Sequence, residues 1–295
     1  MWSTTPMLEA SPVGNEEIAD WLEMAILAFG QKGNTNHKIL KWASDWANLT
    51  ELQTSSGLKV MERRHSLLGE KYPFEVNDFA VVLDQAMENS IYTYLLLSTR
   101  PANSVTWQSP TPTQEESDLF EELVAFALKD YLGDSAEAIP FGWPSKFGRP
   151  MEFPLAIDWL AGKMGLKLGS AFRPPRRKDG GVDVVAWKPF RDRRSGFPIY
   201  LVQCTLQKDF VSKSRDIDLR IWAGWLEMDH DPVTILALPR SIGPGESWNE
   251  ITANSIIFDR FRLLESLNRE IPEGHKDYVQ KLLPSLRKFA SLNFE

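Results

Sequence analysis

The chain has 295 residues, a formal net charge of −7 and a single cysteine, Cys204. This length suits one large domain or two smaller ones, and a lone cysteine excludes an intrachain disulfide. No apolar run approaches the roughly 18 residues that span a membrane, and the first residues lack the basic and apolar segments of a secretory signal. We therefore expect a cytoplasmic protein that makes no membrane contact.

Residues 15 to 99 are expected to be mostly helical. Apolar residues recur at helical spacing after Asn15, which is expected to cap the first helix, and again from about residue 37 to residue 46. The apolar run from residue 90 to residue 98 suits a buried helix. No catalytic motif stands out here, so residues 1 to 99 are interpreted as an accessory region. Three prolines mark residues 100 to 113 as the linker that follows it.

The remaining residues alternate helices with short apolar strands. Helices are expected at residues 114 to 132, 153 to 165 and 217 to 228, with strands at 178 to 187, 199 to 205 and 233 to 238. Residues 138 to 149 are interpreted as a loop, and further helices are expected after Asp259 and from about residue 276 to residue 292. This order predicts an α/β domain at residues 114 to 295, in which helices flank a mixed central sheet.

Two of the predicted strands each carry one polar residue where a core strand should have none. These residues are Asp183, within Lys178 to Trp187, and Gln203, within Ile199 to Thr205. The connection between the strands is short and polar, which favours an antiparallel hairpin in which Asp183 and Gln203 point at one spot. A buried carboxylate is costly unless it is paired or binds a metal. We interpret the pair as half of a metal site.

Positive charge is concentrated around these two strands. Residues 173 to 215 hold eleven Lys or Arg and four Asp or Glu, a net charge of +7, so the rest of the chain carries −14. Such a local field can hold a phosphate backbone, although a solvated arginine-rich loop is the structural alternative. The residues that we expect to contact nucleic acid are Arg173, Arg176, Arg177, Lys178 and Arg215.

Three stretches together resemble the PD-(D/E)XK nuclease superfamily, and most closely its Mrr-like restriction endonuclease branch. They are Phe120-Glu121-Glu122-Leu123-Val124 on a predicted helix, Asp179-Gly180-Gly181-Val182-Asp183, and Ile199-Tyr200-Leu201-Val202-Gln203. The resemblance covers roughly residues 115 to 240. It implies a restriction-endonuclease-like sheet and a metal site of Glu121, Asp183 and Gln203 that binds Mg²⁺ or Mn²⁺. Whether Glu121 or Glu122 faces the metal is left open, since acidic residues are also ordinary in the first turns of a helix.

The sequence departs from the family pattern where a lysine is expected two residues after Gln203. Thr205 stands at that position, and Lys208 and Lys213 follow closely. The resemblance implies that the lysine can be supplied by a neighbouring element. Lys213 is our first choice because Ser212 can cap a helix that begins there, and Lys208 is the second. The alternative for each lysine is a solvated surface charge.

Other chemistries find little support. One cysteine and four histidines exclude an ordinary zinc cluster, and the phosphate-binding, dinucleotide-binding and Gly-x-Ser-x-Gly motifs are absent. The resemblance implies a metal-dependent nuclease, with DNA favoured over RNA as substrate, that serves as a bacterial restriction or anti-phage defence effector. The alternative is a catalytically inactive nuclease-fold subunit that binds nucleic acid or another protein. A partner protein and self-association are both left open.

Overall fold

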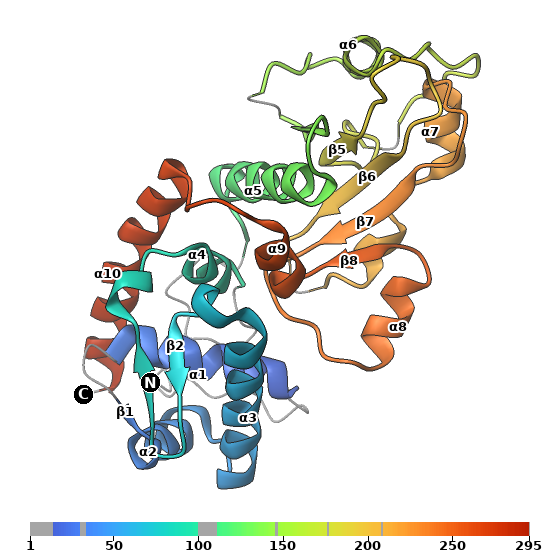
Figure 1. The fold of residues 1–295 in the computed structure, drawn as a ribbon. Coiled ribbons are helices and arrows are strands. Elements are labelled where there is room, and N and C mark those ends of the chain that lie inside the picture. The colour runs from blue at the N-terminus through green and yellow to red at the C-terminus, as the bar shows by residue number, and fades with distance from the viewer. Residues whose placement is uncertain are drawn as a thin grey trace, which may run out of the picture. The chain divides into compact units, whose positions relative to one another are not determined.

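The computed structural model describes residues 14–29, 34–99, 111–144, 147–175, 177–207 and 209–294. The chain is mixed α/β and divides into two compact units (Figure 1). Unit 1 comprises Met1–Pro112, Pro239–Gly243 and Arg269–Glu295, and unit 2 comprises Thr113–Leu238 and Pro244–Asn268. The C-terminal helix thus belongs to unit 1, whereas we expected residues 114 to 295 to form one domain. Residues 100 to 110 of the expected linker lie outside the described residues.

Unit 1 combines helices with a small antiparallel sheet of strand order β1-β3-β2. Its helices are α1 (Asn15–Phe29), α2 (Asn36–Ala47), α3 (Glu51–Leu68), α4 (Ile91–Ser98) and α10 (Glu273–Phe294), with 3₁₀ turns η1 (Gly69–Lys71) and η2 (Gln85–Met87). Its strands are β1 (Asn34–Thr35), β2 (Phe74–Val76) and β3 (Ala80–Leu83). The region is mostly helical, as expected, but the sequence reading missed the sheet and α3. Helix α3 has few apolar residues, and a capping box of Thr50 and Gln53 marks its start.

The expected cap of α1 is wrong by one residue. The Gly14 carbonyl accepts hydrogen bonds from the backbone N–H groups of Glu17 and Ile18, at 2.9 and 3.1 Å, so Asn15 lies in the first turn. At the other end of the chain, α10 packs against α1 and α4. The ring of Tyr94 in α4 meets His275 edge-on, with ring centroids 4.7 Å apart. These contacts explain why α10 belongs to unit 1.

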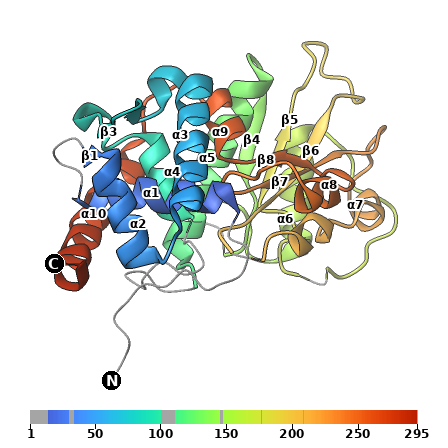
Figure 2. The ribbon, with the colours of Figure 1, turned by 90° about the horizontal axis from the view of Figure 1, so that it is seen from below.

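Unit 2 is built on a five-stranded mixed sheet of order β4-β5-β6-β7-β8 (Figures 1 and 2). Its strands are β4 (Glu137–Pro140), β5 (Val184–Trp187), β6 (Ile199–Cys204), β7 (Val233–Ala237) and β8 (Ile256–Phe258). Its helices are α5 (Gln114–Leu132), α6 (Phe153–Met164), α7 (Leu219–Trp225), α8 (Glu246–Thr252) and α9 (Arg260–Ser266), with a 3₁₀ turn η3 (Ser212–Arg215). The first three strands are antiparallel, and β6, β7 and β8 are parallel. The predicted mixed sheet with flanking helices is confirmed.

Strand β4 was expected to be part of a loop. It pairs with β5 from Glu137 opposite Trp187 to Pro140 opposite Val184. Proline is tolerated there because β4 is an edge strand, where a missing N–H does not interrupt the ladder. The strand is short and only partly buried, so its sequence lacks a clear alternation of apolar and polar residues.

The two faces of this sheet are covered by different helices. Val185, Trp187, Ile199 and Leu201 alternate with their neighbours along β5 and β6, and they join the core that also holds α6 and α7. Helix α5 packs against β4, β5 and β6. Asp183 and Gln203 therefore sit at the end of two strands whose faces are already occupied by apolar packing. Within the described residues, no helix has the length and apolar character needed to cross a membrane.

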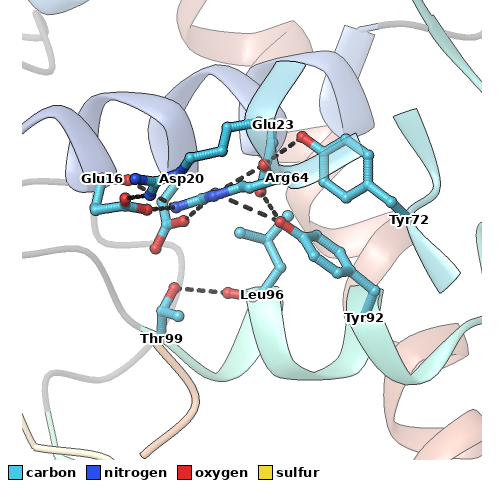
Figure 3. Close-up of polar contacts among 9 residues, drawn as sticks. Glu16, Asp20, Glu23, Arg64, Tyr72, Tyr92, Leu96 and Thr99 are labelled. Carbon is cyan, nitrogen blue, oxygen red and sulfur yellow. Dashed lines mark hydrogen bonds and ion pairs between the residues drawn. The ribbon is translucent and has the colours of Figure 1, made fainter. Parts of the chain in front are cut away.

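Unit 1 is held together by a buried arginine that bridges its helices (Figure 3). The side chain of Arg64 in α3 is fully buried and forms ion pairs with Glu16, Asp20 and Glu23 of α1, each at 2.7 Å. The hydroxyls of Tyr72 and Tyr92 each donate to the Glu23 carboxylate at 2.7 Å. Both oxygens of Glu23 are thereby hydrogen-bonded, as a fully buried carboxylate requires.

We expect Arg64→Met to lower the free energy of unfolding by about 3–5 kcal/mol, because the change leaves Glu23 buried without its cation. The matched control is Arg63→Met on the same helix. Arg63 pairs with Glu16 but its side chain is 48% exposed, so its loss should cost less than about 1 kcal/mol. Urea unfolding followed by circular dichroism measures both values, and equal losses would contradict the proposed role of Arg64.

Candidate functional site

Asp183 and Gln203 meet across the β5–β6 hairpin. The strands are antiparallel, with Val184 opposite Val202, and the Asp183 N–H donates to the Val202 carbonyl at 2.8 Å. The side-chain amide Nε2 of Gln203 donates to Asp183 Oδ2, and the backbone N–H of Cys204 donates to the same oxygen at 2.7 Å. The hairpin and the convergence of the two side chains are confirmed.

Two oxygens at this point are left for a ligand. Both hydrogen bonds to the Asp183 carboxylate end on Oδ2, so Oδ1 accepts none within the described residues. Gln203 is only 7% exposed, and its side-chain carbonyl Oε1 is buried without a hydrogen-bond partner. The two hydrogen bonds that Gln203 Nε2 donates, to Asp183 and to the Cys204 carbonyl at 3.0 Å, fix the orientation of the side-chain amide. A buried acceptor without a donor is costly, and a cation would satisfy it.

Helix α5 brings Glu121 to the same place. The Asp183 carbonyl accepts from the backbone N–H groups of Phe141 and Gly142, at 2.6 and 3.0 Å, which holds this segment beside Asp183. A Cβ atom on Gly142 would lie 2.5 Å from Glu121 Oε2. A larger residue at this position would therefore require the Glu121 carboxylate to move. No hydrogen bond or ion pair reaches this carboxylate from the described residues.

The electrostatics show that the carboxylates share one environment. Burial raises the pKa of Glu121 to about 10, and the charges of Asp183, Asp118 and Asp179 add to the rise. Burial, followed by the charge of Asp179, raises the pKa of Asp183 to about 7. The Cys204 N–H and the positive charges of Lys213 and Arg177 oppose this second rise. A metal ion would remove the repulsion that keeps these groups protonated.

The choice between Glu121 and Glu122 is made by their surroundings. Burial alone raises the pKa of Glu122, and no acidic neighbour contributes. Glu121 instead interacts with Asp183 and lies against Gly142. Glu121 is therefore the carboxylate of α5 that belongs to the candidate site.

Lys213, our first choice for the lysine missing at Thr205, has an electrostatic effect on Asp183. Lys213 lies in η3, its ammonium is 3.5 Å from Asp216 Oδ2, and its charge lowers the pKa of Asp183. The expected cap at Ser212 is wrong. The turn from Ser212 to Arg215 is a 3₁₀ helix without a side-chain cap. Asp218 already caps the next helix, so the segment before it is too short for an α-helix. Lys208 lies outside the described residues.

The basic residues differ in their contacts. Arg177 pairs with Asp216 at 2.6 Å and lowers the pKa of Asp183, so it lies near the candidate site. Lys178 is exposed and lies over the ring of Trp143. Arg215 pairs with Glu250 at 2.9 Å with its side chain 64% exposed, and Arg173 is also exposed. Arg176 lies outside the described residues.

The sequence reading missed the contribution of Asp179. Its carboxylate accepts a hydrogen bond from the Gly181 N–H at 2.8 Å, and its charge raises the pKa values of both Glu121 and Asp183. Gly181 has a φ of +80°, and a Cβ there would lie 2.6 Å from the Asp216 carbonyl. The Asp-Gly-Gly sequence predicts such a turn. Its electrostatic effect follows only from the fold around it.

The donor set suits a hard cation that keeps part of its water shell. Among the described residues, no three His, Cys, Asp or Glu side chains gather closely enough to hold a metal on their own. Two carboxylates and one amide oxygen would therefore leave several positions to water, which is usual for Mg²⁺. The unpartnered Gln203 Oε1 and the unneutralised carboxylates fit such an ion.

Comparison of the chain with protein-family models, with curated proteins and with solved structures gives no match in any of the three.

The raised carboxyl pKa values predict a stability that falls with pH. Between the ordinary pKa of a glutamate and about 10, the folded state binds a proton at Glu121 that the unfolded state has lost. Without metal, the melting temperature should therefore fall from about pH 5 to about pH 9, and Glu121→Gln should flatten that fall. Glu122→Gln is the control and should flatten it less.

Added Mg²⁺ should raise the melting temperature of the wild type, and more so at the higher pH, because the ion competes with protons for the carboxylates. Differential scanning calorimetry across this pH range makes both measurements. Identical pH slopes for the wild type and Glu121→Gln would show that Glu121 does not occupy the described environment.

Proposed function

We propose that this protein is a metal-dependent nuclease that hydrolyses phosphodiester bonds. The observation that carries the proposal is the convergence of two carboxylates with raised pKa values, Glu121 and Asp183, with the unpartnered side-chain carbonyl oxygen of Gln203. The resemblance of the three stretches to PD-(D/E)XK nucleases supports it, since the matched residues come from a helix and two neighbouring strands. By that resemblance, DNA is favoured as substrate, and defence against foreign DNA as the role.

The proposed reaction assigns a role to each of these side chains. Asp183, Glu121 and Gln203 would hold Mg²⁺ through oxygen atoms. When bound, Mg²⁺ lowers the pKa of water and neutralises charge on the phosphate. The N–H groups of Gln203 and Cys204 fix the orientation of the Asp183 carboxylate, so that Oδ1 faces the ligand with little loss of entropy on binding.

Lys213 and Arg177 supply positive charge beside the carboxylates. Both interact with Asp183, and both pair with Asp216, which holds them on the same side of the site. In the proposed reaction, Lys213 orients the attacking water or stabilises the charge that develops on the phosphate. Arg177, with its side chain 48% exposed, is available to contact a neighbouring phosphate.

One observation favours the alternative of an inactive nuclease-fold subunit that binds nucleic acid or protein. Thr205, at the expected lysine position, is buried, and its hydroxyl accepts a hydrogen bond from the Gln207 N–H at 3.1 Å. Its role in this turn is structural, so catalysis depends on a lysine from elsewhere. An inactive subunit would bind nucleic acid without cutting it in any divalent metal.

We expect Asp183→Asn to reduce cleavage by at least about a thousandfold, because loss of a charged ligand removes several kcal/mol of transition-state stabilisation. Asparagine can still accept the Cys204 N–H, so the fold should be retained. The control is Asp192→Asn in the hairpin loop, where the carboxylate pairs with the exposed Arg194. Plasmid cleavage with Mg²⁺ and with a chelator measures both, and wild-type rates for Asp183→Asn would refute the assigned site.

We expect Lys213→Ala to lose most activity, about a hundredfold, while calorimetric Mg²⁺ binding stays within about twofold of the wild type. Lys208→Ala should lose less. Lys129→Ala is the control, because Lys129 forms an exposed pair with Glu137 at the far end of α5. Should Lys213→Ala, Lys208→Ala and the double variant all cut normally, neither lysine replaces the one missing at Thr205.

A further inference from the structure

Two loops beside the candidate site are tied together by two cation–π contacts. The guanidinium of Arg149 lies 4.5 Å from the centroid of the Phe141 ring, and its NH2 group donates to the Lys178 carbonyl at 2.8 Å. The ammonium of Lys178 in turn lies 3.5 Å from the centroid of the Trp143 ring. The segment that contains Phe141 and Trp143 is therefore fastened to the segment that leads into Asp179.

Trp143 directly follows Gly142, the residue that lies beside both Asp183 and Glu121. The N–H of Gly142 donates to the Asp183 carbonyl at 3.0 Å, and a Cβ on Gly142 would lie 2.5 Å from Glu121 Oε2. Trp143 is the next residue along the chain, with its Cα about 3.8 Å from that of Gly142. The segment that borders the site therefore carries an aromatic residue.

The loop that carries Trp143 is held by the buried Arg149, and the Trp143 ring is covered by the exposed Lys178. Arg149 is only 3% exposed, and it also donates to the Pro150 carbonyl at 3.0 Å, so it fixes the loop. Trp143 is partly buried, and Lys178 is exposed. An incoming phosphate can draw the Lys178 ammonium away from the ring, because an anion binds an ammonium more strongly than an aromatic face does. That exchange would uncover the indole next to the bound phosphate.

We propose that Trp143 stacks on an unpaired base next to the phosphate held at the candidate site, while Lys178 contacts the backbone. The proposal rests on the proposed function and narrows its substrate to single-stranded or locally unpaired nucleic acid. Bases inside a duplex stack on one another and present only their edges in the grooves. Bases of a single strand offer their faces, and tryptophan is a suitable partner for them.

The test measures binding separately from cleavage. Fluorescence anisotropy with the full chain in Ca²⁺ compares a labelled single strand, a blunt duplex of the same sequence and a duplex with a single-stranded flap. The variants are Trp143→Ala and Trp143→Phe, with Trp159→Ala as the matched control. Trp159 in α6 is also partly buried and also lies beneath a lysine, with Lys163 Nζ 5.8 Å from its ring centroid. Circular dichroism verifies that each variant is folded.

We expect Trp143→Ala to weaken binding of the single strand and the flap by about tenfold and to leave duplex binding unchanged. Trp143→Phe should keep most of the affinity, since a ring remains, and Trp159→Ala should match the wild type. A 2-aminopurine base in the single strand should lose fluorescence on binding to the wild type and much less on binding to Trp143→Ala. Equal losses on the duplex, or no loss on the single strand, would overturn the stacking role.

Cleavage in Mg²⁺ then distinguishes this inference from the proposed nuclease activity. If the wild type cuts the duplex as fast as the flap and Trp143→Ala changes neither rate, the substrate inference fails while the nuclease assignment stands. If Trp143→Ala loses single-strand binding but the wild type never cuts in Mg²⁺ or Mn²⁺, the stacking role stands and the nuclease assignment fails. A wild type that binds none of the three probes overturns both.

Discussion

A carboxylate that is partly withdrawn from water needs a compensating charge or hydrogen bonds, and this requirement organises unit 2 around Asp183. Its Oδ2 receives two N–H groups from β6, and its backbone carbonyl receives two more from the segment after β4. The Asp183 backbone thus joins the ends of β4, β5 and β6. The compensation is incomplete at the side chain, because Oδ1 and the Gln203 carbonyl have no donor among the described residues. That incompleteness is what points to a ligand.

The two units treat buried carboxylates differently. In unit 1, Glu23 is fully buried, but Arg64 and two tyrosine hydroxyls satisfy both of its oxygens. In unit 2, Glu121 is partly buried among other acidic groups, and its pKa rises to about 10. The first arrangement is complete in itself and contributes stability through the contact between α1 and α3. The second leaves buried acidic groups close to one another, and strongly shifted carboxyl pKa values of this kind are common at functional sites.

Gly142 links the candidate site to the surface that we propose for substrate binding. The missing side chain admits the Glu121 carboxylate, and the N–H of the residue binds Asp183. The next residue, Trp143, receives the Lys178 ammonium on its ring. The proposed metal ligands and the proposed substrate contact therefore meet at a single short segment after β4. A side chain at the position of Gly142 would displace the Glu121 carboxylate.

The sequence alone was sufficient for the parts that depend on local pattern. The apolar runs of β5, β6 and β7 and the periodicity of α5 and α6 are strong, and a single polar residue in each of two strands indicated that Asp183 and Gln203 belong together. Strand β4, the small sheet of unit 1 and the placement of α10 were not predictable in this way. Short edge strands have little pattern of their own, and the position of a terminal helix depends on which apolar face it finds.

The tertiary structure decided which charges interact. The sequence gives no reason to choose between Glu121 and Glu122 on their helix. Only the proximity of Gly142 and Asp183 to Glu121 distinguishes the two residues. The position of Lys213 beside Asp183 follows from a 3₁₀ turn that its sequence did not predict. The periodicity of apolar residues in the sequence predicts which residues are buried, because burial depends on the face of the helix or strand. The neighbours that a buried charge meets come from distant parts of the chain, and these only the fold brings together.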